Sequence, residues 1–224
     1  MQLRDLATFG SNDDLKNNLQ SIATRLESVA TRLYARKDLG IASRVYPRIA
    51  RSTADQLGLL SRLVTEQIEI TASVCRTVFE INVTFRFCLS SPERLEHFAT
   101  QRGTDEISIY KALKKMPTEG DQTARLAVLD LRIEHLRAIL ERHERPLKPD
   151  RPTLREMVKA VDLESDYDCL YSLYSKYVHA SAWFVLGERD RIDLPAFRQI
   201  MQLHAQLYAS DTLGRLEELG TKAS

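Results

Sequence analysis

The first part of this chain carries an apolar pattern that is typical of a helix. Ser11 offers an N-cap, and Asp14 three residues later completes a short form of the capping box. The pattern predicts a helix whose apolar stripe packs inside its own domain or, because the stripe is narrow, against a second chain. Its apolar side chains recur at steps of 4, 3, 4, 3 and 4 residues, about three heptads in all: Leu15, Leu19, Ile22, Leu26, Val29 and Leu33.

Helical spacing continues through most of the chain and predicts an all-α fold. A long helix is expected from about residue 48 to 89, although residues 81–89 alternate apolar and polar side chains as a strand does. We expect a helix there, because no other segment offers a partner strand and a lone strand leaves its backbone unpaired. Further helices are expected from residue 91, at 104–116 and 123–145, from residue 153, and at 166–186 and 195–219.

The composition is that of a helical protein without a strong overall charge. The 224 residues include only 8 glycines and 7 prolines, and 32 basic against 31 acidic side chains give a net charge of +1. Such a chain has no global field that would draw it to nucleic acid or to an anionic membrane. We expect two parts, a lead-in with the heptad-patterned helix at residues 1–46 and a helical bundle domain at 47–224.

The cysteines and the hydropathy pattern favour a cytoplasmic protein. Cys75, Cys88 and Cys169 are an odd number without a CxxC pair and lie among apolar residues, so we expect reduced, buried side chains. The first residues lack the apolar core of a signal peptide. No run approaches the ~18 apolar residues of a membrane span, so no membrane partner is expected.

The side chains best suited to chemistry are concentrated between Tyr171 and Trp183. Residues four apart lie nearly above one another on a helix, so a single helix here would align Tyr171, Ser175, His179 and Trp183. Imidazole is a common general acid or base, which makes His179 the candidate catalytic residue. Tyr171, Ser175 and Lys176 are candidate ligand-binding residues. The alternative is that His179 is a partly buried histidine bonded to a neighbouring polar group.

A second candidate group lies on the long helix expected before residue 89. Arg76 and Glu80 are four residues apart in an otherwise apolar segment, so they share a helix face near the interior. Buried charges need partners. The pair is therefore either purely structural or meets His179 or a tyrosine hydroxyl across a helix interface. Arg86 is a further basic candidate for the same cluster.

The sequence contains none of the common motifs for metals or nucleotide cofactors. Its histidines lack HExxH or other metal-ligand spacing, and it has no glycine-rich phosphate loop and no G-x-S-x-G turn. We therefore expect neither a metal nor a cofactor.

Several short segments together resemble a bacterial helical family of unknown function. They are Arg76-x-x-x-Glu80, Thr153-Leu-Arg-Glu-Met, Tyr171-x-x-x-Ser175 and Tyr177-Val-His179. Members of that family carry an arginine and a glutamate on an early helix and a Tyr…Ser-x-x-Val-His signature on a late one. The resemblance covers roughly residues 50–190. It implies an architecture similar to the HEPN superfamily, with additional N- and C-terminal helices.

The resemblance also implies a range of activities. HEPN proteins are often dimers, and many are metal-independent ribonucleases of toxin–antitoxin and phage-defence systems, whereas others are not catalytic. Their active form uses an R-x4-6-H motif, in which arginine binds the scissile phosphate and histidine helps to move a proton. Counting back from His179, the arginine would fall at residues 172–174, which are Ser172, Leu173 and Tyr174. Arg76 would have to supply the cation instead.

Three functions are therefore expected, each as a homodimer. The first is a stress or phage-defence protein that binds a nucleotide, RNA or a protein partner through a cluster of Arg76, Glu80, Ser175 and His179. The second is a ribonuclease toxin with His179 as general base and Arg76 and Glu80 in the catalytic set. The third is a dimerisation or interaction module that binds its partner through residues 15–33.

Overall fold

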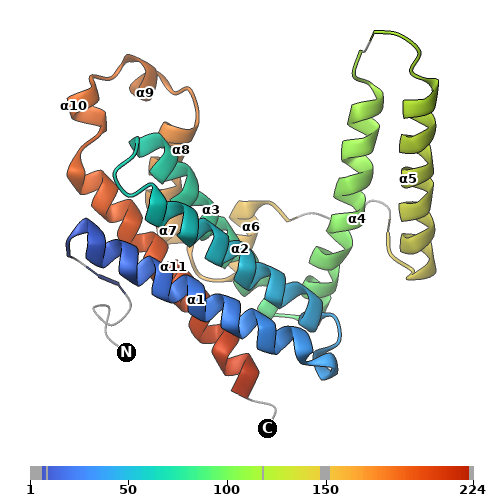
Figure 1. The fold of residues 1–224 in the computed structure, drawn as a ribbon, viewed down its shortest axis with the longest axis horizontal. Helices are drawn as coiled ribbons and strands as arrows, with labels where there is room; N and C mark the ends of the chain where they lie inside the picture. Colours follow the sequence, from blue (N-terminus) through green and yellow to red (C-terminus); the bar gives the residue numbers. More distant parts are fainter. Residues whose placement is uncertain (1–6, 9, 118, 147–151, 222–224) are drawn as a thin grey trace. The chain divides into compact units, whose positions relative to one another are not determined.

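The computed structural model describes residues 7–8, 10–117, 119–146 and 152–221. Every regular element in these residues is a helix or a helical turn, which confirms the expected all-α class (Figure 1). None of the helices in these ranges is both long and apolar enough to cross a membrane. Most of the expected lead-in, residues 1–10, lies outside the described residues.

The heptad stripe forms α1 (Asn12–Ala35), as predicted. The capping box is present, because Ser11 Oγ accepts from the Asp14 backbone at 3.2 Å and the Asp14 carboxylate accepts from the Ser11 backbone at 2.9 Å. All six stripe residues are buried within this chain, where α1 packs on α2 (Ala42–Arg62) and α11 (Pro195–Thr221). A protein partner at residues 15–33 would therefore have to bind the opposite face of α1.

Residues 48–89 contribute to two helices, so the expectation of a single long one is wrong. A short turn separates α2 from α3 (Ile68–Leu89). Val64, inside this turn, is buried, and so is Ile68 at the start of α3, whereas residues 65–67 are exposed. The apolar spacing thus continues while the helix is interrupted. Residues 81–89 belong to α3, which confirms the helical interpretation of that segment.

The next two helices, α4 (Pro92–Lys114) and α5 (Thr123–Arg142), lie side by side as a hairpin (Figure 1). The sequence predicts two separate helices, from residue 91 and over residues 104–116, but α4 is continuous. Thr104 does not start a new helix, because its side chain is buried and its hydroxyl donates to the carbonyl of Gln101 at 2.9 Å.

The helix expected at residues 166–186 is also interrupted. His179 ends α8 with an extended backbone, φ −103° and ψ 153°. Ser181 stabilises this break, because its hydroxyl donates to the Lys176 carbonyl at 2.8 Å and accepts from the Phe184 backbone at 3.2 Å as the cap of the following helix. The pieces are α7 (Glu164–Asp166), the π-helical turn η3 (Tyr167–Tyr171), α8 (Ser172–Val178) and α9 (Ala182–Leu186).

The chain divides into two compact units. One comprises Met1–Ser90 with Thr153–Ser224, and the other is Ser91–Pro152. In the first unit α3 contacts α2, α11, α8 and the short α6 (Leu154–Ala160), so it lies at the centre of the packing. The expected domain division at residues 46/47 falls inside α2. The remaining short elements are η2 (Lys37–Leu39) and α10 (Arg189–Ile192).

A buried asparagine joins α3 to α11. Asn82 Nδ2 lies 3.1 Å from the Tyr208 carbonyl, 2.8 Å from Asp211 Oδ2 and 3.0 Å from Thr212 Oγ1. The buried amide nitrogen is thus hydrogen-bonded, whereas the oxygen Oδ1 of Asn82 has no partner among the described residues. The contacts of Nδ2 join α3 to α11 at this position.

Candidate functional site

Arg76 and Glu80 form an ion pair at the edge of the buried face of α3. Arg76 Nε lies 2.8 Å from Glu80 Oε1, and the two side chains are 18% and 38% exposed. The neighbouring residues Cys75, Val78 and Phe79 are fully buried. The pair therefore sits where the apolar interior meets solvent, which restricts the conformations of Arg76 while leaving part of it accessible.

The guanidinium of Arg76 also reaches two residues that are far away in the sequence. Its Nη1 lies 3.2 Å from Nε2 of His179, and its Nη2 donates to the hydroxyl of Tyr171; these residues are 103 and 95 positions from Arg76. The carbon Cζ of Arg76 lies 4.4 Å from the centroid of the Tyr171 ring, so the cation also stacks on that ring. We name Arg76, Glu80, Tyr171 and His179 the Arg76 cluster.

The π-helical turn η3 positions Tyr171 in this cluster. The rings of Tyr167 and Tyr171 stack at 4.7 Å between centroids with an angle of 15° between their planes. The Phe79 ring lies 6.3 Å from Tyr171. Single π-helical turns are uncommon and occur frequently at functional sites. Here the turn holds Tyr171 in contact with both Tyr167 and Arg76.

His179 is exposed at the end of α8, and its ring orientation follows from its partner. Its backbone N–H donates to the Ser175 carbonyl at 3.2 Å, which closes the last turn of the helix. A guanidinium can only donate hydrogen bonds. Nε2 of His179 therefore accepts from Arg76, and the ring hydrogen of this neutral form is on Nδ1.

Burial and charge set the protonation of the cluster. Partial burial lowers the pKa of Arg76, but the hydrogen bond to Glu80 and its negative charge outweigh this and hold that pKa above its ordinary value. Burial, followed by the charge of Glu80, raises the pKa of Tyr171. At neutral pH Arg76 is thus a cation and Tyr171 a neutral phenol.

The geometry leaves part of the Arg76 guanidinium available to a ligand. Among the described residues, Glu80, His179 and Tyr171 engage three of its five N–H groups. One N–H on each Nη atom has no partner among the described residues, and an arginine with donors to spare suits an anionic oxygen ligand such as a carboxylate or a phosphate. Nowhere in the described ranges do three or more His, Cys, Asp or Glu side chains gather as a metal-ligand set.

The structure brings only some of the other candidate residues to this cluster. Ser175 is half-buried and contacts His179 through its backbone, and Lys176 is exposed on the same helix. Arg86 lies about 15 Å further along α3, where it pairs with Asp211 at 3.2 Å. The predicted stripe that included Trp183 is wrong, because that residue lies on α9 after the break.

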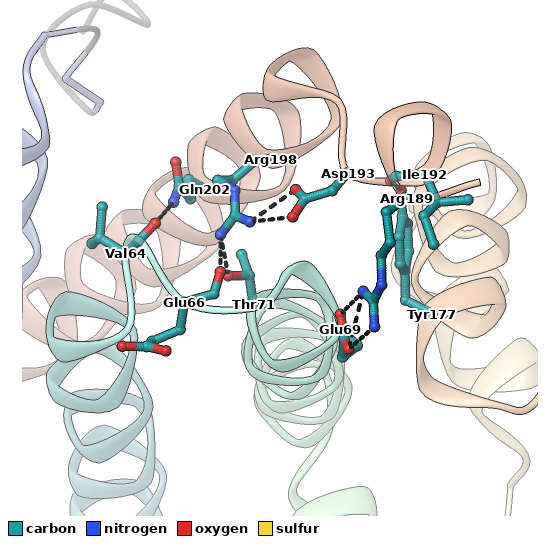
Figure 2. Close-up of polar contacts among 10 residues, drawn as sticks. All are labelled: Val64, Glu66, Glu69, Thr71, Tyr177, Arg189, Ile192, Asp193, Arg198 and Gln202. Carbon is teal, nitrogen blue, oxygen red and sulfur yellow. Dashed lines mark hydrogen bonds and ion pairs between the residues drawn. The ribbon is translucent and has the colours of Figure 1, made fainter. Parts of the chain in front are cut away.

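The segment that follows His179 is held by a second set of polar contacts (Figure 2). Arg198 forms two hydrogen bonds to Asp193 at 2.8 and 3.0 Å and also donates to the Glu66 carbonyl. Arg189 pairs with Glu69 at 3.3 Å. These contacts tie the residues on either side of Ile192 to the start of α3.

Two further hydrogen bonds in Figure 2 complete this attachment. The Tyr177 hydroxyl donates to the Ile192 carbonyl at 2.5 Å, and Gln202 Nε2 donates to the Val64 carbonyl at 3.2 Å. Burial raises the pKa of Tyr177 to about 12, so the donor stays protonated at neutral pH. The chain on both sides of His179 is therefore attached, directly or through Ile192, to the start of α3.

A family model matches residues 41–191, and its description is a family of unknown function, DUF5677. The chain belongs to this family. No curated protein and no solved structure matches the chain.

The DUF5677 match includes all four residues of the Arg76 cluster and the α4–α5 hairpin. It excludes α1 and α11, although these helices pack in the same unit as α3. In this DUF5677 protein, the cluster is thus built by the matched region, and helices outside the match help to bury its apolar interior.

Sequence reasoning missed two contributors to the site. Tyr167 was not considered, although its position four residues before Tyr171 is the spacing of stacked neighbours on a helix. Ser181 was not recognised as a helix cap, although serine is one of the preferred residues there. Recognising that cap would have predicted the break that frees His179 from the helix.

Proposed function

We propose that this protein is a cytoplasmic, HEPN-like helical protein of a prokaryotic stress or phage-defence system, and that its Arg76 cluster binds a phosphate group of a nucleotide or an RNA. The observation that carries the proposal is the meeting of Arg76 and His179 at 3.2 Å from two separate elements. A cation and an imidazole, both reachable from solvent, suit a phosphate ligand.

Glu80 and Tyr171 support this function by fixing the cation. Glu80 accepts a hydrogen bond from Nε of Arg76. Tyr171 accepts a hydrogen bond at its hydroxyl, and its ring stacks on the guanidinium. Arg76 is therefore already held in place before a ligand binds, so that binding costs little side-chain entropy. Ser175 and Lys176 on α8 are the nearest further groups for the ligand along that helix.

The test is binding of AMP, inorganic phosphate and two short RNAs that differ only in a 5′-phosphate or 5′-hydroxyl. We expect calorimetry to detect binding of the phosphorylated ligands. Arg76→Gln should raise their dissociation constants by at least about tenfold, since hydrogen bonds to charged groups contribute about 1.5–3 kcal/mol.

Arg25→Gln is the matched control. It removes an ion pair in which Nη2 of Arg25 contacts both carboxylate oxygens of Glu217, at 2.9 and 3.0 Å, elsewhere in the same unit, and should leave binding unchanged. Absence of binding by the unaltered protein, or equal losses in both variants, would contradict the proposal.

A metal-independent ribonuclease is the second candidate function. The observation that favours it is the position of Arg76 beside His179. Residues 172–174, where the R-x4-6-H motif would place its arginine, contain none, and Arg76 would take that role. The substrate phosphate would then replace Nε2 of His179 as the partner of Arg76. Nε2 would accept a proton from the attacking 2′-hydroxyl, Arg76 would stabilise the phosphate charge, and Glu80 would position Arg76. RNA cleavage that persists in EDTA and disappears in His179→Ala would support this function. Intact RNA after incubation with the unaltered protein would exclude it.

A purely structural interaction module is the third candidate. Because the stripe of α1 is buried within the chain, a partner at residues 15–33 would contact the exposed face of that helix. Glu27→Ala and Tyr34→Ala, two changes on that face, should then weaken partner binding without lowering stability. If neither change affects binding, α1 is not the partner surface.

A further inference from the structure

One face of α2 carries a line of arginine side chains. A helix turns by about 100° per residue, so residues separated by 4, 3 and 11 positions share one narrow face. Four arginines with this spacing lie within about 60° of one another around the helix axis and extend over roughly 27 Å along it. We name them the arginine row, and all four are exposed: Arg44, Arg48, Arg51 and Arg62.

The arginine row concentrates positive charge in a chain that is almost neutral as a whole. α2 contains these four arginines and one acidic residue, Asp55, so its net charge is +3 whereas that of the whole chain is +1. Asp55 is exposed on the same face, between Arg51 and Arg62. The potential along this face is therefore positive, although the protein has no strong overall field.

The guanidinium groups of the arginine row have no partners in this chain. Among the described residues, none of the four forms an ion pair or a side-chain hydrogen bond. By contrast, other arginines of the same unit pair with carboxylates at 2.6 to 2.9 Å, among them Arg25, Arg36 and Arg198. An arginine without a carboxylate partner keeps five N–H donors for a ligand.

Gly58 leaves the same face of α2 open. It lies between Asp55 and Arg62 on that face. Apart from the helix backbone and the neighbours in the chain, the described residues place one atom within 4 Å of the position that a Cβ of Gly58 would take, Nη1 of Arg62 at 3.8 Å. In this part of the structure no other helix therefore packs against Gly58, and a residue without a side chain allows a ligand to approach closely.

We propose that the arginine row binds the phosphate backbone of a nucleic acid. Guanidinium groups match phosphate oxygens with paired N–H donors. Backbone phosphates form a line of regularly spaced negative charges, and the arginine row presents its positive charges along a line. The row shares no residue with the Arg76 cluster, so this surface does not depend on the function proposed for that cluster.

Other anionic partners fit the arginine row less well. A helix that binds a membrane surface inserts an apolar face into the lipid boundary, and protein interfaces rely on apolar or aromatic anchor residues. Ile49, Leu57 and Leu60 of α2 are buried within the unit, and none of the large exposed apolar side chains of the described residues lies on α2. A face that offers charge alone suits backbone phosphates, whose contacts are mainly electrostatic.

The experiment measures binding of the full-length protein to RNA and DNA strands of one mixed sequence, about 16 nucleotides long, the upper end of the usual site sizes. Arg48→Gln and the triple change of Arg44, Arg48 and Arg51 to Gln remove charge from the row, and Asp55→Asn removes the acid on its face. The control Arg102→Gln removes an exposed arginine from α4, in the other unit. Far-UV circular dichroism checks that each variant is folded.

We expect the triple change to raise the dissociation constant by at least about tenfold and Arg48→Gln by a smaller factor, whereas Asp55→Asn should lower it. The plot of log affinity against log salt concentration should become less steep by about 0.7 for each arginine removed, because fewer counterions are released. Arg102→Gln should change neither quantity. The strand that binds more tightly, RNA or DNA, identifies the source of the phosphates.

Three results would overturn the proposal: no strand binding by the unaltered protein, an unchanged salt dependence in the triple variant, or equal losses in Arg48→Gln and Arg102→Gln. Vesicles of phosphatidylserine and polyglutamate serve as competing anions. If either binds more tightly than both strands, the arginine row belongs to a membrane or an acidic protein and the proposal is wrong.

AMP separates this proposal from the one made for the Arg76 cluster. A single phosphate cannot span the arginine row, so AMP binding should be the same in the triple variant as in the unaltered protein. Strand binding that depends on the row, without any AMP binding, would support the row and contradict the function proposed for the Arg76 cluster. Equal losses of AMP and strand binding in the triple variant would overturn the row as a separate site.

Discussion

The apolar stripes of α1 and α5 follow similar spacing but lie in different surroundings. The stripe of α1 is buried, because α2 and α11 cover it within the same chain. On α5, Val128 and Leu131 are 58% and 71% exposed, since that helix packs in its unit against α4 alone. Helical spacing therefore predicts that a face is apolar, and the other helices of the unit decide whether it is buried within one chain.

The largest expected effect separates these two stripes directly. Leu26→Ala, at a fully buried position of α1, should lower the free energy of unfolding by about 3 kcal/mol through lost burial and a cavity. Leu131→Ala, at a position that is 71% exposed, should change it by less than about 0.5 kcal/mol. Urea denaturation measures both. Equal losses would mean that the two stripes have the same surroundings.

A change in the hairpin core tests whether the two units unfold separately. Leu140→Ala should destabilise the hairpin by about 2 kcal/mol, because Leu140 is one of three residues in its buried cluster. Hydrogen exchange should then accelerate in α4 and α5 while α3 keeps its protection. Equal acceleration in α3 would show that the chain unfolds as one cooperative body.

The polar contact between α3 and α11 gives the next effect. Asn82→Ala should cost about 2 kcal/mol of unfolding free energy, because it removes a buried amide that contacts Tyr208, Asp211 and Thr212 on α11. The control is Asn17→Ala on the exposed face of α1, which should stay within about 0.5 kcal/mol. A loss at Asn82 no greater than at Asn17 would assign the alignment of α11 to apolar packing alone.

Helix caps give the smallest effect and again distinguish the two units. Ser11→Ala should destabilise the first unit by about 1 kcal/mol, because Ser11 caps α1. Ser91 precedes α4 without a side-chain cap hydrogen bond, so Ser91→Ala should have a smaller effect. Thermal unfolding measures both variants. A larger loss at Ser91 would contradict the role assigned to the Ser11 cap.

The sequence predicted the features that depend on neighbouring residues. The capping box at Ser11, the helical state of residues 81–89 and the pairing of Arg76 with Glu80 all follow from spacings of three or four residues. One of the two interpretations of that pair, contact with His179 and a tyrosine hydroxyl, agrees with the structure. The roles of these residues in binding or catalysis stay predictions.

The features that sequence reasoning got wrong depend on interruptions and on distant partners. The break at His179 falls where residue spacing still suits a helix, and only the cap formed by Ser181 indicates it. The sequence suggests Arg86 as a member of the cluster, but Arg86 instead forms an ion pair with Asp211, 125 residues later. Such long-range pairing cannot be read from periodicity, because it depends on how α11 packs against α3.

The position of Trp183 gives the protein its own optical reporter. It is the single tryptophan of the chain, it is 41% exposed, and its ring meets the edge of Tyr177 at 5.1 Å, just after His179. Light at the long-wavelength edge of aromatic absorption therefore excites one indole only, and its emission wavelength records how much water surrounds the segment beyond the Arg76 cluster. Events at that cluster can be followed without attaching a dye.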